Sequence, residues 1–197
     1  MCCKKGGPAF HTEDADLVHN GMIQAKYLYT LRRGEWGYDP VLKKVMPLNS
    51  EIIKTREISE SRACVFFTGT ENSCRIYKNR PMECRVLKCW DTREIETIYC
   101  RNLLTRKALL SGMPDLWALI EDHDRQCSYE MVQNLLYSGM KISAPDRKTS
   151  ILEMIQYDRQ IRILVVEKAG MDPDLLDFIL GRPLLETVRK MEAGIRR

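Results

Sequence analysis

The spacing of the cysteines is the feature that most constrains how this chain folds. Seven of the eight cysteines lie in the first 100 of the 197 residues, and Cys64, Cys74, Cys84 and Cys89 follow the spacing C-x9-C-x9-C-x4-C. In a reducing compartment, thiols clustered in this way indicate metal binding or redox chemistry rather than disulfides. The pattern is not that of a zinc ribbon, because paired C-x2-C knuckles are absent. The spacing therefore predicts a metal centre of another kind in residues 64–89.

A vicinal pair, Cys2-Cys3, adds two candidate ligands at the N-terminus. Two adjacent residues that chelate one tetrahedral ion close a small, strained ring, and six thiols exceed the four ligands that such an ion takes. The six thiols fit either a multinuclear site or one ion with spare ligands. An iron–sulfur cluster takes cysteine ligands spread over several irons, so the expected cofactor is zinc or iron, with a cluster left open.

Basic side chains flank these thiols in the sequence. Nearby cations lower the pKa of a thiol, and they offset the negative charge of several thiolates around one metal centre. We therefore expect the ligands to be electrostatically prepared for a metal. The basic residues concerned are Lys4, Lys5, Arg75, Lys78, Arg80, Arg85 and Lys88.

The segment YKNRPMECRVLKC, together with the cysteines before it, resembles the zinc- or iron-chelating family called CxxCxxCC or YkgJ-type. In that family a cysteine run ends in a vicinal pair, and a later segment reads cysteine, aliphatic, Tyr, two residues, Arg-Pro, two residues, Cys-Arg and a final Cys. The matching residues here are Cys74, Ile76, Tyr77, Arg80, Pro81, Cys84, Arg85 and Cys89. The resemblance implies metal chelation by Cys2, Cys3, Cys64, Cys74, Cys84 and Cys89.

The N-terminus departs from this family pattern. The family has two more cysteines before the vicinal pair, whereas only Met1 precedes Cys2 here. Either the true start lies upstream of Met1, or the protein works with six matching thiols, and we expect the first. The resemblance assigns no reaction, so the cellular role stays open.

The remaining candidate residues are interpreted as having structural roles. Free cysteine is commonly a small buried hydrophobe, which is the reading for Cys100 and Cys127. Pro81 is expected to fix a turn that returns Cys84 toward Cys74, with Arg80 pairing with a carboxylate or a carbonyl. The glycines of residues 6–8 are expected to let the backbone fold tightly. The histidines, which could be ligands but are more often hydrogen-bonded or surface residues, are His11, His19 and His123.

The pattern of apolar residues predicts a mainly α protein whose cysteine-rich N-terminal half carries a small β-hairpin and loops. The hairpin is expected over residues 62–77, turns over 34–50, and a short helix over 13–20. Helical periodicity from residue 101 onward predicts amphipathic helices, the longest over 149–168, with further helices after Asp172 and from Pro183. We predict a metal-binding domain over residues 1–100 and a helical region packed on it over 101–197.

Composition narrows the class of function. The net charge of +4, from 31 basic and 27 acidic residues, is too small to indicate a nucleic-acid partner. No signal peptide or membrane span is apparent, so a soluble cytoplasmic protein without membrane contact is expected, its partner a metal ion or cluster. A protein partner remains open.

The sequence has no HExxH and no GxSxG motif, so nothing in it indicates a hydrolase. Two alternatives are an iron–sulfur-dependent enzyme, such as a protein-modifying one, and a structural-zinc interaction module.

Overall fold

The computed structural model describes residues 2–58, 60–88, 90–137 and 144–195. The chain forms two compact units, and neither is one continuous stretch of sequence. Unit 1 consists of residues 1–31 and 51–111, and unit 2 consists of residues 32–50 and 112–197. Residues 32–50 therefore leave the N-terminal unit and fold with the C-terminal helices. A metal-binding domain that ends at residue 100 stays a prediction.

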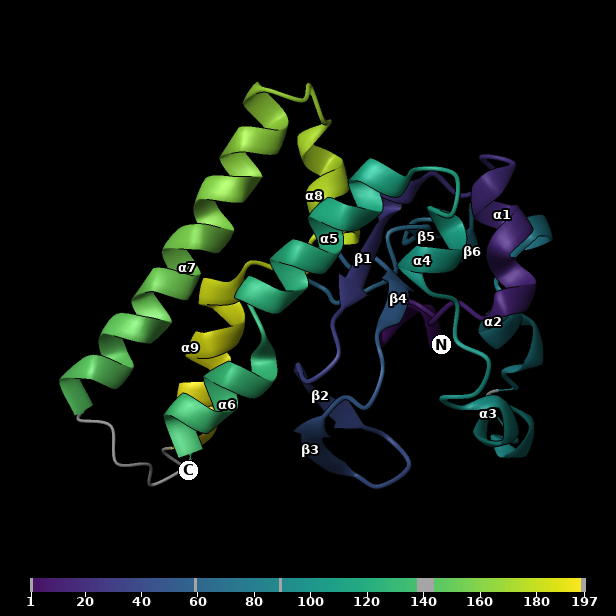
Figure 1. The fold of residues 1–197 in the computed structure, drawn as a ribbon. Coiled ribbons are helices and arrows are strands. Elements are labelled where there is room, and N and C mark those ends of the chain that lie inside the picture. The colour runs from purple at the N-terminus through teal and green to yellow at the C-terminus, as the bar shows by residue number, and fades with distance from the viewer. Residues whose placement is uncertain (1, 59, 89, 138–143, 196–197) are drawn as a thin grey trace. The chain divides into compact units, whose positions relative to one another are not determined.

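Unit 1 is built from short elements (Figure 1). Its 3-10 turns are η1 (Cys2–Lys4), η2 (Thr12–Asp14), η3 (Ala25–Tyr27) and η4 (Tyr77–Asn79). Its strands are β1 (Leu28–Leu31), β4 (Ile52–Thr55), β5 (Phe67–Thr68) and β6 (Ser73–Cys74). Its α-helices are α1 (Ala15–His19), α2 (Met82–Val86), α3 (Arg93–Ile98) and α4 (Arg106–Leu109). Together, η2 and α1 confirm the short helix that was predicted over residues 13–20.

An antiparallel pair of strands, β1 and β4, organises the core of unit 1. Leu28 pairs with Thr55 and Thr30 with Ile53, and all four are buried because alternate side chains of a strand point to the same face. The N-terminal segment lies along β4, where the Phe10 amide donates to the Ile53 carbonyl at 2.9 Å. The buried apolar residues of this core include Phe10, Ile23, Leu28, Ile53, Phe66 and Leu104.

The predicted cysteine hairpin is confirmed. Strands β5 and β6 are antiparallel, with Phe67 opposite Cys74, and Asn72 takes a positive φ of 48° in the turn between them. Asparagine tolerates this left-handed conformation better than most residues. Pro81, with φ −56°, then precedes α2, the helix that carries Cys84.

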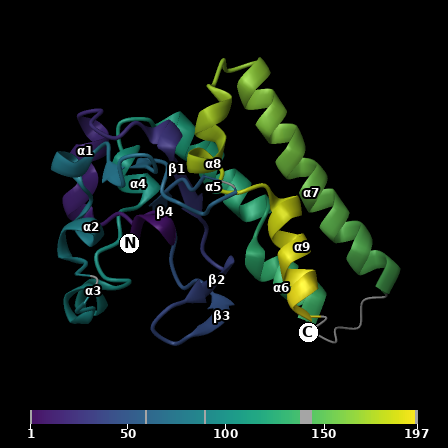
Figure 2. The same ribbon diagram turned by 180° about the vertical axis from the view of Figure 1, so that it is seen from behind.

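Unit 2 combines one hairpin with longer helices (Figures 1 and 2). The hairpin strands are β2 (Trp36–Asp39) and β3 (Lys44–Pro47). The helical elements are α5 (Pro114–Gln126), α6 (Tyr129–Tyr137), α7 (Ala144–Glu167), η5 (Pro173–Leu175), α8 (Leu176–Ile179) and α9 (Leu184–Ile195). In both views α7 lies beside α6 and α9, which it contacts, as it contacts α5.

The turns predicted over residues 34–50 are wrong, because this stretch holds the β2–β3 hairpin. Asp39 makes the reversal possible, since its Oδ1 accepts hydrogen bonds from the Val41 and Leu42 amides at 2.9 and 2.8 Å. An Asx turn of this kind replaces a glycine-based turn. Glycine and proline within the strands gave a turn signal that the pairing overrides.

Helices α6, α7 and α9 enclose a core of their own. Its buried members are Cys127, Tyr129, Val132, Ile151, Met154, Leu184, Val188 and Met191. The helix predicted over residues 149–168 is α7, which begins five residues earlier. Asp172 caps the next element as predicted, because its Oδ1 accepts from the Asp174 amide at 2.9 Å.

The fold class is confirmed only in part. Among the described residues helices outweigh strands, and the antiparallel sheets are all two-stranded. Mainly α describes the C-terminal helices well, whereas the N-terminal half is a mixture of small sheets and turns. No helix in the described parts of the chain combines the length and apolar composition needed to cross a membrane.

Candidate metal centre

Four of the six candidate thiols come from four separate segments of unit 1. Cys3 lies in η1, Cys64 just before β5, Cys74 in β6 and Cys84 in α2. Backbone hydrogen bonds join the first three: the Cys64 amide donates to the Cys3 carbonyl at 2.7 Å, and the Phe67 amide donates to the Cys64 carbonyl at 2.9 Å. Because Phe67 also pairs with Cys74, the three cysteines are neighbours through the backbone alone.

The charges of these thiols act on one another. Burial raises the pKa of the Cys84 thiol well above its usual range, and repulsion from Cys64, Cys3 and Cys74 raises it further. Burial likewise raises the pKa of Cys3, with added repulsion from Cys74 and Cys64. Since charge repulsion falls off with distance, the four side chains form one electrostatic group. No three thiols of the described residues lie within 4.8 Å of one another.

Two carboxylates fix the helix that carries Cys84. Asp14 is fully buried, and its Oδ1 accepts from the Met82 amide in the first turn of α2 at 2.8 Å. Glu83 accepts from the Ala9 amide at 2.7 Å, which ties α2 to the N-terminal segment. Each carboxylate thus accepts a hydrogen bond from a backbone N–H group that would otherwise lack this partner.

His11 belongs to this carboxylate network. Its Nδ1–H donates to the Arg101 carbonyl at 2.8 Å, and its Nε2 lies 3.7 Å from Oε1 of Glu83. The Glu83 carboxylate is the main cause of a raised pKa for His11, against the lowering effect of burial. Both ring nitrogens therefore face oxygen atoms in this structure.

The basic residues do not act on the thiols as predicted. The pKa values of Cys3 and Cys84 are raised, whereas nearby cations were expected to lower thiol pKa values. Burial of the thiols is the main reason, and repulsion among the thiols adds to it. Four of the basic residues also contact other partners. These partners are the Tyr77 ring for Arg80 (3.7 Å), Asp14 for Arg85 (3.4 Å), the Val65 carbonyl for Arg75 (2.6 Å) and Glu94 for Lys88.

Glycine 7 permits a close approach between the N-terminal segment and β4. A Cβ atom at this position would lie 1.8 Å from Oγ1 and 2.4 Å from the carbonyl oxygen of Thr55. The same Thr55 hydroxyl lies 3.6 Å from the Cys64 sulfur. Only glycine fits between these groups, so it sets how near the N-terminal cysteines come to Cys64.

The remaining cysteines differ in how far the structure describes them and in their burial. Cys2 lies in η1 but its side chain is not described, and Cys89 lies outside the described residues. The full set of six ligands therefore stays a prediction. Cys127 is buried as expected, whereas Cys100 is exposed, so its interpretation as a buried hydrophobe is wrong.

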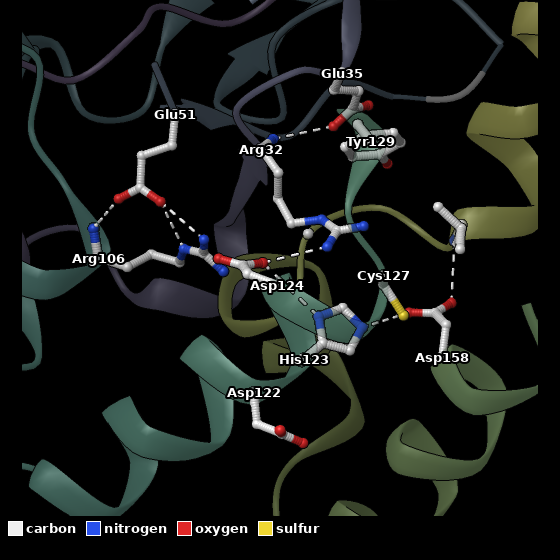
Figure 3. Close-up of polar contacts among 12 residues, drawn as sticks. Arg32, Glu35, Glu51, Arg106, Asp122, His123, Asp124, Cys127, Tyr129 and Asp158 are labelled. Carbon is white, nitrogen blue, oxygen red and sulfur yellow. Dashed lines mark hydrogen bonds and ion pairs between the residues drawn. The ribbon is translucent and has the colours of Figure 1, made fainter. Parts of the chain in front are cut away.

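Unit 2 contains a second constellation that the sequence interpretation missed. His123 and Cys127, four residues apart at the end of α5, meet Asp158 of α7, and one ligand atom of each lies within 4.8 Å of the others (Figure 3). Residues four apart lie on the same face of a helix, so the His-x3-Cys spacing could have predicted that His123 and Cys127 lie close together. Nothing in the sequence indicates that Asp158, in a separate helix, joins them.

Comparison with known proteins agrees with the cysteine pattern. The sequence model of the family CxxCxxCC, described as "Putative zinc- or iron-chelating domain", matches residues 1–101 of the 197. No curated protein and no solved structure matches the chain. The matched region contains all the cysteines except Cys127, and it covers just over half of the sequence. The chain therefore belongs to the CxxCxxCC family.

Proposed function

We propose that unit 1 chelates zinc or iron through the thiolates of six cysteines. They are Cys2, Cys3, Cys64, Cys74, Cys84 and Cys89. The observation that carries the proposal is that backbone hydrogen bonds and the β5–β6 pairing bring Cys3, Cys64 and Cys74 together. The charges of these three thiols also act on Cys84. Cys2 and Cys89 are included in the ligand set because each adjoins this group in the family pattern.

The electrostatics of the group fit a metal ion. Without a cation, burial and mutual repulsion keep the Cys84 thiol protonated, since they raise its pKa. A bound cation reverses this effect, because it stabilises the thiolates and displaces their protons. The group is thus poorly suited to hold free thiolates and well suited to exchange protons for a metal. Such chemistry needs reduced thiols, which accords with the cytoplasmic location that we propose.

A polynuclear iron centre is a second candidate, favoured by the spread of the thiols. Four sulfurs around one zinc ion lie about 3.8 Å apart, as follows from Zn–S bonds of about 2.3 Å in a tetrahedron. No three thiols of the described residues approach one another within 4.8 Å. An iron–sulfur cluster, whose cysteines bind different irons, accommodates such a spread without closure of the site.

Metal analysis of anaerobically purified protein tests the proposal. Wild type should carry zinc or iron, and a brown colour would identify a cluster. Cys84→Ser should lose the metal of unit 1, while Cys100→Ser, a change of an exposed thiol, should keep it. Less than about a tenth of an equivalent of any transition metal in wild type would contradict chelation. Full metal content in Cys84→Ser would show that the ligand set is wrong.

A further inference from the structure

A thiol, an imidazole and a carboxylate meet in the interior of unit 2. His123 and Cys127 have 0% exposure and Asp158 has 3%. Nε2 of His123 lies 2.8 Å from Oδ1 of Asp158, and the three ligand atoms lie within 4.8 Å of one another (Figure 3). Buried polar groups are costly unless they are paired, so a cluster of three such groups requires an explanation.

The imidazole of His123 is incompletely paired in this arrangement. Its Nε2 faces Asp158, while its Nδ1 is buried and makes no hydrogen bond to any described residue. Oδ1 of Asp124 lies 3.8 Å from Nδ1, which is too long for a hydrogen bond. One ring nitrogen therefore carries an unmet donor or acceptor.

We infer that His123, Cys127 and Asp158 bind a divalent ion of the zinc class. The ion would take Sγ of Cys127, Nε2 of His123 and Oδ1 of Asp158, which frees the imidazole proton to move from Nε2 to Nδ1. There it points at Asp124, in the way that a carboxylate orients a metal-bound histidine. The thiol proton leaves to solvent, so binding releases one proton for each ion bound.

The geometry requires only a local adjustment. Tetrahedral zinc with sulfur, nitrogen and oxygen ligands separates these atoms by about 3.4 to 3.6 Å, as its bond lengths imply. The Nε2–Oδ1 distance must therefore open from 2.8 Å, while all three atoms already lie within 4.8 Å. Asp158 remains held during this change, because its Oδ2 accepts from the Leu184 amide at 3.0 Å.

Two cations, Arg32 and Arg162, act on the charges of the site. Nε of Arg162 lies 3.1 Å from Oδ1 of Asp158, and its charge opposes a metal ion there. Arg162 also donates to the Gly181 carbonyl at 2.7 Å and lies 3.6 Å from Oδ1 of Asp177. These contacts keep the guanidinium paired when the ion takes Oδ1.

The donor set identifies the class of ion. Thiolate and imidazole favour zinc and its transition-metal neighbours, whereas magnesium and calcium prefer oxygen ligands alone. Because the ligands come from two helices and all are buried, the ion would link the end of α5 to α7 inside unit 2. This site lies within unit 2 and does not depend on the function proposed for unit 1.

The test titrates Zn²⁺ and Co²⁺ into a full-length variant without the six thiols of unit 1. That variant carries Cys2→Ser, Cys3→Ser, Cys64→Ser, Cys74→Ser, Cys84→Ser and Cys89→Ser. It should bind about one equivalent of Zn²⁺, and Co²⁺ should give a thiolate-to-cobalt charge-transfer band. Adding Cys127→Ser should abolish both signals, and adding Cys100→Ser should leave both. Absence of binding in a variant that keeps its helical circular dichroism overturns the inference.

A second measurement uses the intact thiols of unit 1. Cys127→Ser or His123→Gln should lower the Zn²⁺ stoichiometry of the otherwise wild-type chain by about one equivalent. Asp124→Asn should keep the ion but weaken its affinity by about 10- to 100-fold, the usual effect of losing an outer partner of a metal-bound histidine. Equal stoichiometry and affinity in wild type and Cys127→Ser overturn the inference, even if the six-serine variant does not fold.

Discussion

Asp14 and Glu83 hold the cysteine segments of unit 1 together through backbone amides, yet the charge of Glu83 opposes a free thiolate at Cys84. Asp14 accepts from the amides of His11 and Met82, at 3.1 and 2.8 Å. Glu83 accepts from the Ala9 amide, and its charge adds to the raised pKa of Cys84. A cation at the thiols would relieve this conflict, because it attracts thiolates and carboxylates alike.

The pairing of His11 with Glu83 predicts a pH dependence of stability. Glu83 raises the pKa of His11 above its ordinary value of 6.5, so the folded state holds the proton more tightly than the unfolded state. The stabilisation is fully present below pH 6.5 and is lost as pH rises through the folded-state pKa. Urea denaturation of wild type should therefore show stability falling above that pH, and His11→Gln should flatten the fall.

The control for this prediction is His19→Gln. His19 is exposed, and its Nε2 lies 3.4 Å from the Leu109 carbonyl, a weak contact at the surface of unit 1. The His19→Gln variant should keep the wild-type dependence of stability on pH. A profile for His11→Gln with the same slope as wild type would show that the His11–Glu83 pair does not govern stability in this range.

At the scale of elements, the close contact between the N-terminal segment and β4 predicts how a substitution at Gly7 changes the free energy of unfolding. Gly7→Ala places a Cβ against both the side chain and the backbone of Thr55. The hydroxyl can rotate away but the carbonyl cannot, so we expect a loss of about 2–4 kcal/mol in the free energy of unfolding. Urea denaturation followed by circular dichroism measures it.

Gly69→Ala is the matched control for this change. Gly69 lies in the turn between β5 and β6 of the same unit, and a Cβ there meets nothing within 4 Å. Its stability should change by less than about 1 kcal/mol. If Gly7→Ala proves equally mild, the N-terminal segment does not depend on close contact with β4.

Elements with a local signal could be predicted from the sequence, and those set by distant contacts could not. The hairpin around Cys74 and the helix after Asp172 have turn residues and caps at their own ends. The β2–β3 hairpin was missed because its glycine and proline mask the strands. The constellation of His123, Cys127 and Asp158 was missed because it needs α5 and α7 to meet, which depends on packing alone.

At the scale of the whole molecule, the family match and the two units do not coincide. The match spans residues 1–101, but residues 32–50 fold with unit 2, and unit 1 continues to residue 111. The unit with the cysteines has a small core around β1 and β4, whereas unit 2 has helices packed around Tyr129 and Met154. A metal at the thiols should therefore matter most to the stability of unit 1, since metal-binding energy is also folding energy.

Hydrogen exchange can separate the two units in the intact chain. Cys84→Ser should speed amide exchange in peptides from residues 64–88, because these segments lose a metal that joins them. Peptides from α6 and α9 should exchange as in wild type, since their protection rests on a hydrophobic core of their own. Cys100→Ser serves as the exposed control. Mass spectrometry of both variants decides the outcome, and faster exchange in α6 and α9 as well would show that the units unfold together.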